Sequence, residues 1–207
     1  MFEGEQMVTS FNRCGVDVAC IGNHDLDFGI EQMDKVLRKT MQPHGNCQWV
    51  MTNLVPEDKP LDGPEGVGIC MRKVILNKAG RKIGFLGIAE HEWVTTFKNL
   101  EVDVIYQNYK RCATEYAKRL KEEDRCDMVI ALTHMRVQHD EKFAREIPGV
   151  DLVLGGHDHE YYIRDVKHEL KVGKGIEKKF VPVVKSATDF LDMSEIDITF
   201  EVPEKEF

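Results

Sequence analysis

The chain has 207 residues, of which 42% are apolar and 31% are charged, and its formal net charge is −8. A chain of this size can bury one core, and its acidic balance excludes non-specific attraction to nucleic acid or to anionic membranes. No segment reaches the roughly 18 consecutive apolar residues of a transmembrane helix. We therefore expect a single domain over residues 1–207, with no nucleic-acid partner and no membrane partner.

The first half of the chain alternates helical and strand patterns. An apolar stripe from Met7 to Cys14 predicts a helix over residues 2–14 that stops at Gly15. Further along, the patterns predict a short buried strand over 17–21, a helix over 30–39, a strand over 48–55 and a loop over 56–68.

The second half continues the alternation. A continuous stripe from Tyr109 to Leu120 predicts the clearest helix, over 109–123. The other predicted elements are a hairpin with strands over 69–76 and 83–88, strands over 127–134, 150–159 and 180–186, and a helix over 140–147. Strict alternation in EIDITFEV predicts a last strand over 195–202, with Ile196, Ile198, Phe200 and Val202 inward. Together these elements predict an α/β fold.

The six cysteines form no Cys-x-x-Cys pair and no compact disulfide framework. Cys14, Cys20, Cys112 and Cys126 lie in or beside apolar segments, which predicts that most of the cysteines are small buried side chains with reduced thiols. The opening residues, MFEGEQMV, have neither the basic start nor the apolar run of a signal peptide. We therefore expect a cytoplasmic protein.

Three of the predicted strands end in side chains that can hold a metal ion. The endings are CIGNHD with Asn23, His24 and Asp25, ALTH with His134, and LGGHDH with His157, Asp158 and His159. In open α/β sheets, ligands collect outside the carboxyl ends of the strands. Imidazole and amide or carboxylate oxygens suit Zn, Mn, Fe or Ni better than Ca or Mg. The pattern indicates a metal site, and a two-metal site that clamps a phosphoryl group is consistent with it.

Glycines precede two of these endings. We expect Gly22, Gly155 and Gly156 to let the backbone turn sharply beside a bound ion. His157 and His159 are two residues apart, so they address two ions unless the backbone between them turns. The four histidines outside these motifs are expected to be structural, as a lone histidine usually is.

The motifs GNHD, TH and GGHDH occur in the order that they have in the calcineurin-like metallophosphoesterases, and the chain resembles this superfamily over nearly its whole length. GNHDLDFG and LTHM are most similar to its 5′-nucleotidase branch. The resemblance implies a metallophosphoesterase-like αββα sandwich with mixed β-sheets flanked by helices. It also implies a hydrolase of phosphoric esters that works by in-line attack of a metal-activated hydroxide.

The resemblance implies a set of metal ligands. Asn23, His134 and His157 would ligate one ion, and His159 would ligate the other. The cofactors would be divalent ions of Mn, Zn, Fe, Co or Ni.

The resemblance also implies the catalytic pair. His24 would stabilise charge on the phosphoryl oxygens and help the leaving group depart, and Asp27 would orient His24. The residues expected to support the ligand loops are Gly22, Asp25, Gly156 and Asp158.

The sequence departs from the family pattern before GNHD. The family begins with a strand that bears Asp-x-His, followed by a Gly-Asp motif whose aspartate bridges both ions, and neither precedes GNHD here. We therefore expect a domain that lacks the first strand or strands and holds at most one ion, weakly. We also expect a domain without the C-terminal substrate domain of the nucleotidases.

Two explanations of this departure stay open. The chain is either a fragment, or a product of a gene start placed too far downstream, of an active enzyme, or it is a truncated and inactive relative. In either case we expect weak or no activity from the chain as given. An incomplete sheet exposes apolar surface and an unpaired edge, which predicts self-association.

The leading hypothesis for function is a metal-dependent phosphomonoesterase of the 5′-nucleotidase type, acting on a small-molecule phosphoester such as a nucleotide. The alternative is a non-catalytic relative that binds a nucleotide or a protein partner. A purely structural zinc domain is disfavoured, because such sites prefer closed Cys and His sets and no cysteine lies in these motifs.

Overall fold

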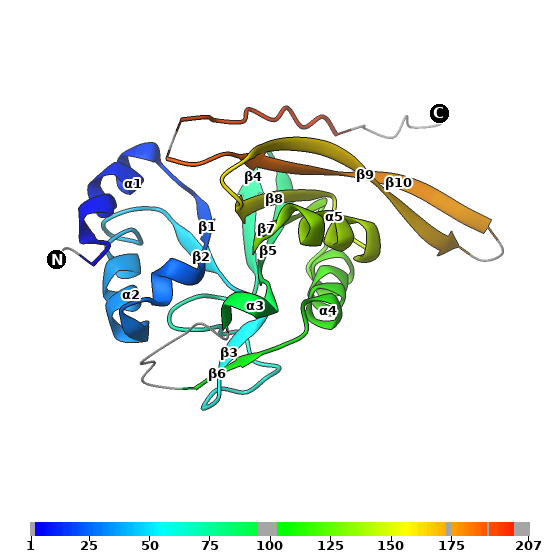
Figure 1. The fold of residues 1–207 in the computed structure, drawn as a ribbon. Helices are drawn as coiled ribbons and strands as arrows, with labels where there is room; N and C mark the ends of the chain where they lie inside the picture. Colours follow the sequence, from blue (N-terminus) through cyan, green and yellow to red (C-terminus); the bar gives the residue numbers. More distant parts are fainter. Residues whose placement is uncertain (1–2, 95–102, 173–174, 190, 201–207) are drawn as a thin grey trace.

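The computed structural model describes residues 3–94, 103–172, 175–189 and 191–200. Figure 1 shows four layers across the molecule. Helices α1 (Val8–Cys14) and α2 (Gly29–Arg38) form the first layer, and α4 (Tyr109–Glu122) and α5 (Val137–Glu146) form the last. Two sheet layers lie between them. The predicted αββα sandwich with mixed sheets flanked by helices is confirmed.

The larger sheet has six strands in the order β4-β5-β7-β8-β10-β9. Their bounds are β4 (Val74–Lys78), β5 (Arg81–Ala89), β7 (Met128–Met135), β8 (Leu152–His157), β9 (Tyr161–Val172) and β10 (Gly175–Ser186). Strands β5, β7, β8 and β10 run parallel, so their carboxyl ends meet at one edge of the sheet. The predicted hairpin is β4–β5, and its turn places Ala79 and Gly80 at φ of 48° and 76°.

The smaller sheet layer consists of two strand pairs. Strand β1 (Val18–Cys20) is parallel to β2 (Gln48–Val50), and β3 (Leu54–Pro56) is antiparallel to β6 (Val104–Tyr106). The short elements are the 3-10 helices η1 (Glu5–Met7) and η2 (Asn23–Leu26) and the single-turn helix α3 (His91–Val94).

The predicted strand over 48–55 is in fact divided between β2 and β3. Two buried polar side chains explain the break. Thr52 Oγ1 accepts a hydrogen bond from Gly87 N at 3.0 Å, and Asn53 Oδ1 accepts one from Ala89 N at 2.8 Å. The side chains of this segment therefore meet the main chain of β5, and an apolar run alone does not reveal this.

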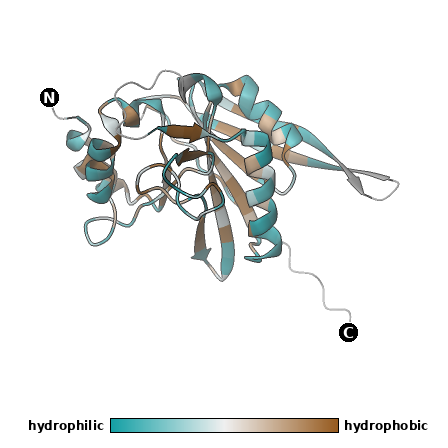
Figure 2. Ribbon diagram, turned by 90° about the horizontal axis from the view of Figure 1, so that it is seen from below, coloured by the Kyte–Doolittle hydropathy of each residue, from teal (hydrophilic) through white to brown (hydrophobic). Residues whose placement is uncertain are grey.

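Two apolar cores hold the layers together. One lies between the six-stranded sheet and helices α4 and α5, and it includes the fully buried Leu86, Leu120 and Phe143. The other lies between β1–β2 and helices α1 and α2, and it includes Leu37 and Trp49. Figure 2 shows hydrophobic residues concentrated on the strands, with hydrophilic residues over the outer faces of the helices. Apolar burial of this kind is the main stabilising contribution to the fold.

The N-terminal layer is less buried than the sequence indicates. Helix α1 stops at Gly15, whose φ of 66° closes the helix as predicted, but Met7 is 43% exposed. Most of the cysteines are buried, as predicted, but in this layer Cys14 is exposed and Cys20 is half-buried. All of β1 is half-buried, because among the described residues only β2 pairs with it. The six cysteines, all within the described ranges, are free.

The predicted strand over 195–202 is wrong in its described part. Residues 195–200 are irregular, and residues 201–202 lie outside the described residues. Ile196 and Ile198 are 40% and 42% exposed, while Phe200 packs under the guanidinium of Arg81 at 5.0 Å. Alternation forms a strand only where a neighbouring strand accepts its hydrogen bonds, and no described strand pairs with this segment.

The sequence interpretation missed β9 as a strand. It forms a long hairpin with β10 at the edge of the sheet. Its alternation is hidden because Arg164 and His168 share a face with the buried Val166, while Tyr161 and Ile163 on the other face are each 57% exposed. No helix in the described part of the chain has both the length and the apolar character needed to cross a membrane.

Candidate metal centre

The parallel strands bring two of the predicted ligands together. His134, on β7, is opposite Ala89 of β5 and Gly156 of β8, and His157 ends β8. The two imidazole rings lie edge to face, with centroids 5.0 Å apart and an interplanar angle of 73°. His134 Nε2 is 3.3 Å from His157 Nδ1.

The third predicted ligand comes from the smaller sheet layer. After β1 the chain passes through Gly22 and enters η2 at Asn23. Asn23 Oδ1 lies 2.8 Å from His134 Nε2. Asn23, which precedes His134 by 111 positions in the sequence, is thus brought together with His134 and His157 across the two sheets.

These three side chains fit one divalent ion. Two atoms bound to the same ion at about 2.0–2.1 Å lie about 3.0–3.4 Å apart, close to the 2.8 Å and 3.3 Å separations found here. Two imidazoles and an amide oxygen suit Mn, Fe, Co, Ni or Zn. Three protein ligands also leave coordination positions for water or a substrate. Among the described residues, no group of three or more His, Cys, Asp or Glu side chains is placed to hold an ion.

The environment keeps His134 neutral. Burial, with the neighbouring imidazole of His157, lowers the pKa of His134 to about 4. A neutral imidazole has a lone pair on one nitrogen, which is the form that binds a metal ion.

The glycines around the site make space instead of turning the chain, which corrects the prediction. Gly22 is extended, and neither Gly155 nor Gly156 has a positive φ. A Cβ atom on Gly22 would lie 2.6 Å from the His134 ring, and one on Gly156 would lie 3.2 Å from it. The residue with left-handed backbone is His157 itself, at φ of 76°.

The predicted pair lies beside this cluster, with His24 on η2 and Asp27 directly after it. His24 Nδ1 is 2.8 Å from Asp27 Oδ2, and the two side chains are 84% and 53% exposed. Asp25 closes the same turn, because its Oδ2 accepts a hydrogen bond from Gly22 N at 2.7 Å. Asp25 therefore fixes the loop that carries Asn23 and His24.

Two residues of the GGHDH motif lie outside the cluster. His159 is exposed, and within the described part of the chain it makes no hydrogen bond or ring contact with Asn23, His134 or His157. Asp158 accepts a hydrogen bond from Val137 N, the first residue of α5. Asp158 thus ties the turn after β8 to the start of that helix.

Glu90 is a buried acid near the site that the sequence analysis missed. It directly follows β5, is 2% exposed, and accepts a hydrogen bond from Arg136 N at 3.1 Å. Its Oε2 atom also lies 2.6 Å from His139 Nδ1. A polar residue directly after an apolar strand was the available signal, but only strand ends with histidine were considered.

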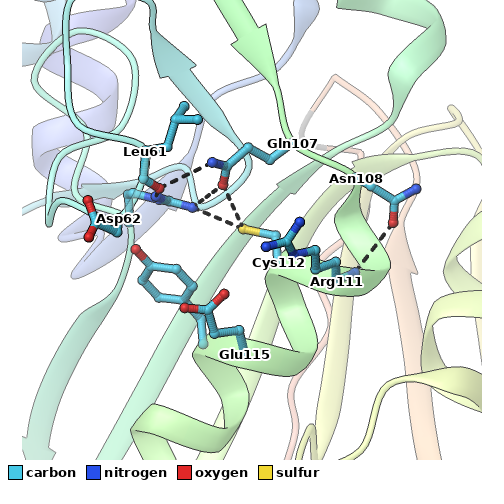
Figure 3. Close-up of a pocket in the computed structure, with 9 residues that line it drawn as sticks. Leu61, Asp62, Gln107, Asn108, Arg111, Cys112 and Glu115 are labelled. Atoms are coloured by element: carbon cyan, nitrogen blue, oxygen red, sulfur yellow. Dashed lines mark hydrogen bonds between the residues drawn. The ribbon is translucent and has the colours of Figure 1, made fainter.

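Two cavities adjoin predicted site residues. One, of about 380 Å³, adjoins His134, and its wall includes Cys20 of β1 and Leu154 of β8. The second, of about 80 Å³, is lined by His24 and Asp25. A further cavity, of about 400 Å³, contains none of the predicted site residues and is shown in Figure 3. At its floor the buried Arg72 donates to Thr52 O at 2.8 Å and stacks on Tyr116 at 4.6 Å. The hydrogen bond and the stacking contact thus hold the Arg72 guanidinium within the protein.

The fold and the cluster define a class of protein, an α/β sandwich with a candidate metal site at the carboxyl ends of parallel strands. The family model of calcineurin-like phosphoesterases matches residues 5–161. The chain belongs to this family.

The curated relatives that the chain resembles include an apyrase and 5′-nucleotidases. The chain is 29% identical over 161 residues to an apyrase of Tabanus yao, covering 76% of this chain and 27% of that protein. It is 25% identical over 163 residues to the 5′-nucleotidase of Rattus norvegicus, covering 78% of this chain and 27% of that protein. The chain therefore spans about a quarter of the length of these curated relatives.

Solved structures share the fold. The NAD nucleotidase of Haemophilus influenzae superposes with a TM-score of 0.69 at 20% identity, over 90% of this chain and 37% of that one. The calcineurin-like phosphoesterase YfkN of Bacillus subtilis gives a TM-score of 0.66 at 21% identity, over 89% and 61%.

Proposed function

We propose that the protein is a divalent-metal-dependent phosphomonoesterase, with nucleotides as its first candidate substrates. The observation that carries the proposal is the convergence of Asn23, His134 and His157, with the His24–Asp27 pair beside them. Family membership supports hydrolysis of phosphoric esters, and the names of the apyrase and 5′-nucleotidase relatives support nucleotides.

The proposal assigns a task to each group of residues. An ion held by Asn23, His134 and His157 would supply positive charge for a phosphoryl group and lower the pKa of water. Such local charge is needed, because a protein with net charge −8 does not itself attract phosphate. His24 stands in solvent next to this position. It can donate a hydrogen bond to a phosphoryl oxygen and a proton to the leaving group.

In this proposal, Asp27 orients the His24 ring. With its carboxylate 2.8 Å from His24 Nδ1, Asp27 accepts a hydrogen bond from the N–H of that nitrogen and fixes the orientation of the ring. The Nε2 nitrogen then faces the substrate, and it is the donor when the ring is an imidazolium, whose charge the Asp27 carboxylate stabilises.

The test is hydrolysis by the protein in its full natural length. We expect release of phosphate from AMP and p-nitrophenyl phosphate in the presence of Mn²⁺ or Co²⁺, and loss of that activity with EDTA. His24→Ala should lower kcat by about 10²- to 10⁴-fold with little change in KM, because His24 acts on the reacting group. His44→Ala is the matched control, since His44 is an exposed histidine outside the cluster.

The outcomes separate the two functions. Turnover that depends on a metal and on His24 supports the phosphomonoesterase. If the protein binds Mn²⁺ or Co²⁺ and AMP but releases no phosphate from a broad panel of esters, the non-catalytic alternative is correct. Asn23→Ala should weaken binding of the ion in either case, which calorimetry measures.

A further inference from the structure

A buried lysine lies directly behind the two histidines. Lys185, on β10, is 1% exposed, and its side chain is fully buried. Its Nζ atom donates hydrogen bonds at 2.5 Å to the main-chain oxygens of Met135 and Gly156. These two residues are the immediate neighbours of His134 and His157 in the chain.

A buried carboxylate balances this lysine. Asp140 of α5 is 0% exposed, and its Oδ2 atom is 2.8 Å from Lys185 Nζ. Thr133 Oγ1, on β7, donates to the other oxygen of Asp140 at 2.6 Å. Asp158, with its side chain 26% exposed, is 3.5 Å from the same ammonium group. The group thus joins β7, β8, β10 and α5 at one point.

The surrounding chain leaves room for this ion pair. A Cβ atom on Gly155 would lie 2.6 Å from Asp140 Oδ2 and 3.0 Å from Lys185 Cε. Any larger residue at position 155 would displace the pair. The packing of the Lys185–Asp140 pair therefore explains why a glycine occupies position 155, independently of the candidate metal ion.

Stability alone is a poor reason for such a pair. Removing two charges from water costs several kcal/mol per ion, and apolar replacements of a buried pair are often as stable or more stable. What an apolar pair cannot do is hold two carbonyl groups of neighbouring strands at a fixed distance. The Lys185 ammonium does this at the two positions that precede or follow a predicted ligand.

We propose that Lys185, neutralised by Asp140, is a positioning residue that sets the relative placement of His134 and His157 through the carbonyls of Met135 and Gly156. The proposal deepens the metal-dependent function and rests on it. Groups that orient ligands from behind typically change metal affinity by about 10- to 100-fold when they are removed.

The test uses two double variants that both remove the buried charges. Lys185→Met/Asp140→Asn has no hydrogen-bond donor on side chain 185, whereas Lys185→Gln/Asp140→Asn keeps an amide donor on a side chain of the same length as methionine. We expect affinity for Co²⁺, measured by calorimetry, to fall about 10- to 100-fold in the Met variant and to recover in part in the Gln variant. The visible Co²⁺ spectrum should change in the same order.

Lys179→Met is the control on the same strand. Lys179 lies six residues earlier on β10 and pairs with Asp151 at the other end of the sheet, where Lys121 also contacts Asp151. The Lys179→Met substitution removes a lysine–aspartate contact about 20 Å from Lys185, so Co²⁺ affinity should not change.

A metal-free measurement separates this proposal from the proposed function. In protein treated with EDTA, the ring resonances of His134 and His157 should shift in the Met variant and keep their positions in Lys179→Met. If the wild type binds no Co²⁺, the metal-dependent function is wrong, and the ring resonances alone decide the role of Lys185. Unchanged resonances and Co²⁺ affinity in the Met variant would overturn the proposal. So would a Met variant that does not fold, because the pair would then be needed for folding itself.

Discussion

The two sides that supply the candidate ligands are built differently. His134 and His157 extend from β7 and β8, inside a six-stranded sheet that helices α4 and α5 cover. Asn23 and His24 follow β1, a strand of three half-buried residues with one described neighbour. The 2.8 Å contact between Asn23 Oδ1 and His134 Nε2 is one direct link between the two sides.

The difference indicates a division of labour. A ligand on a fully packed strand is held in place before any ion arrives, while one on a short, half-buried segment opens at lower free energy. We expect the histidine side to set the position of the ion and the Asn23 side to adapt to it. The predictions below test this comparison.

The largest expected effect is a loss of core packing on the histidine side. Phe143→Ala, on the buried face of α5, should lower the free energy of unfolding by about 3–5 kcal/mol, because Phe143 is fully buried. Phe11→Ala on the other side should cost only about 1–2 kcal/mol, because Phe11 is half-buried and stacks on Trp49 at 5.5 Å. Urea denaturation measures both. Equal losses would contradict the proposed difference in packing.

The second prediction concerns the loss of folding stability at acidic pH. The folded protein keeps His134 neutral down to about pH 4, while the unfolded chain takes up that proton near pH 6.5. Stability that is present above pH 6.5 is therefore lost as the pH falls towards 4. Between pH 7 and pH 5 this histidine should account for about 1–2 kcal/mol of the loss.

The variant that isolates this effect is His134→Gln. Measured by urea denaturation in EDTA, it should lose less stability than the wild type between pH 7 and pH 5. An identical loss in both proteins would show that burial does not hold His134 neutral.

The smallest expected effect is on the Asn23 side. Asp25→Ala removes the carboxylate that accepts from Gly22 N, and it should cost about 1 kcal/mol. Asp27→Ala is the matched control two residues away, where the carboxylate contacts the exposed His24, so stability should change by less than about 0.5 kcal/mol. Hydrogen exchange at the Gly22 amide should rise in Asp25→Ala alone. Faster exchange in both variants would show that the hydrogen bond from Gly22 N to Asp25 is not what stabilises η2.

The sequence by itself determined the elements whose pattern is local. The stripe of α4 was predicted over 109–123 and is found over Tyr109–Glu122, because apolar residues three and four apart fix one helix face without any partner. Strands β5, β7 and β8 were likewise predicted from apolar runs. The order of GNHD, TH and GGHDH also indicated, correctly, the family and its fold.

Only the tertiary structure decided what depends on distant partners. It divided residues 48–55 at Thr52 and Asn53, left residues 195–200 without a strand, and buried Lys185 against Asp140. None of these has a periodic signal, because hydrogen-bond pairing and charge compensation depend on which segments the folded chain brings together. For the same reason the sequence could name Asn23, His134 and His157, but only the packing of two sheets brought Asn23 within 2.8 Å of His134.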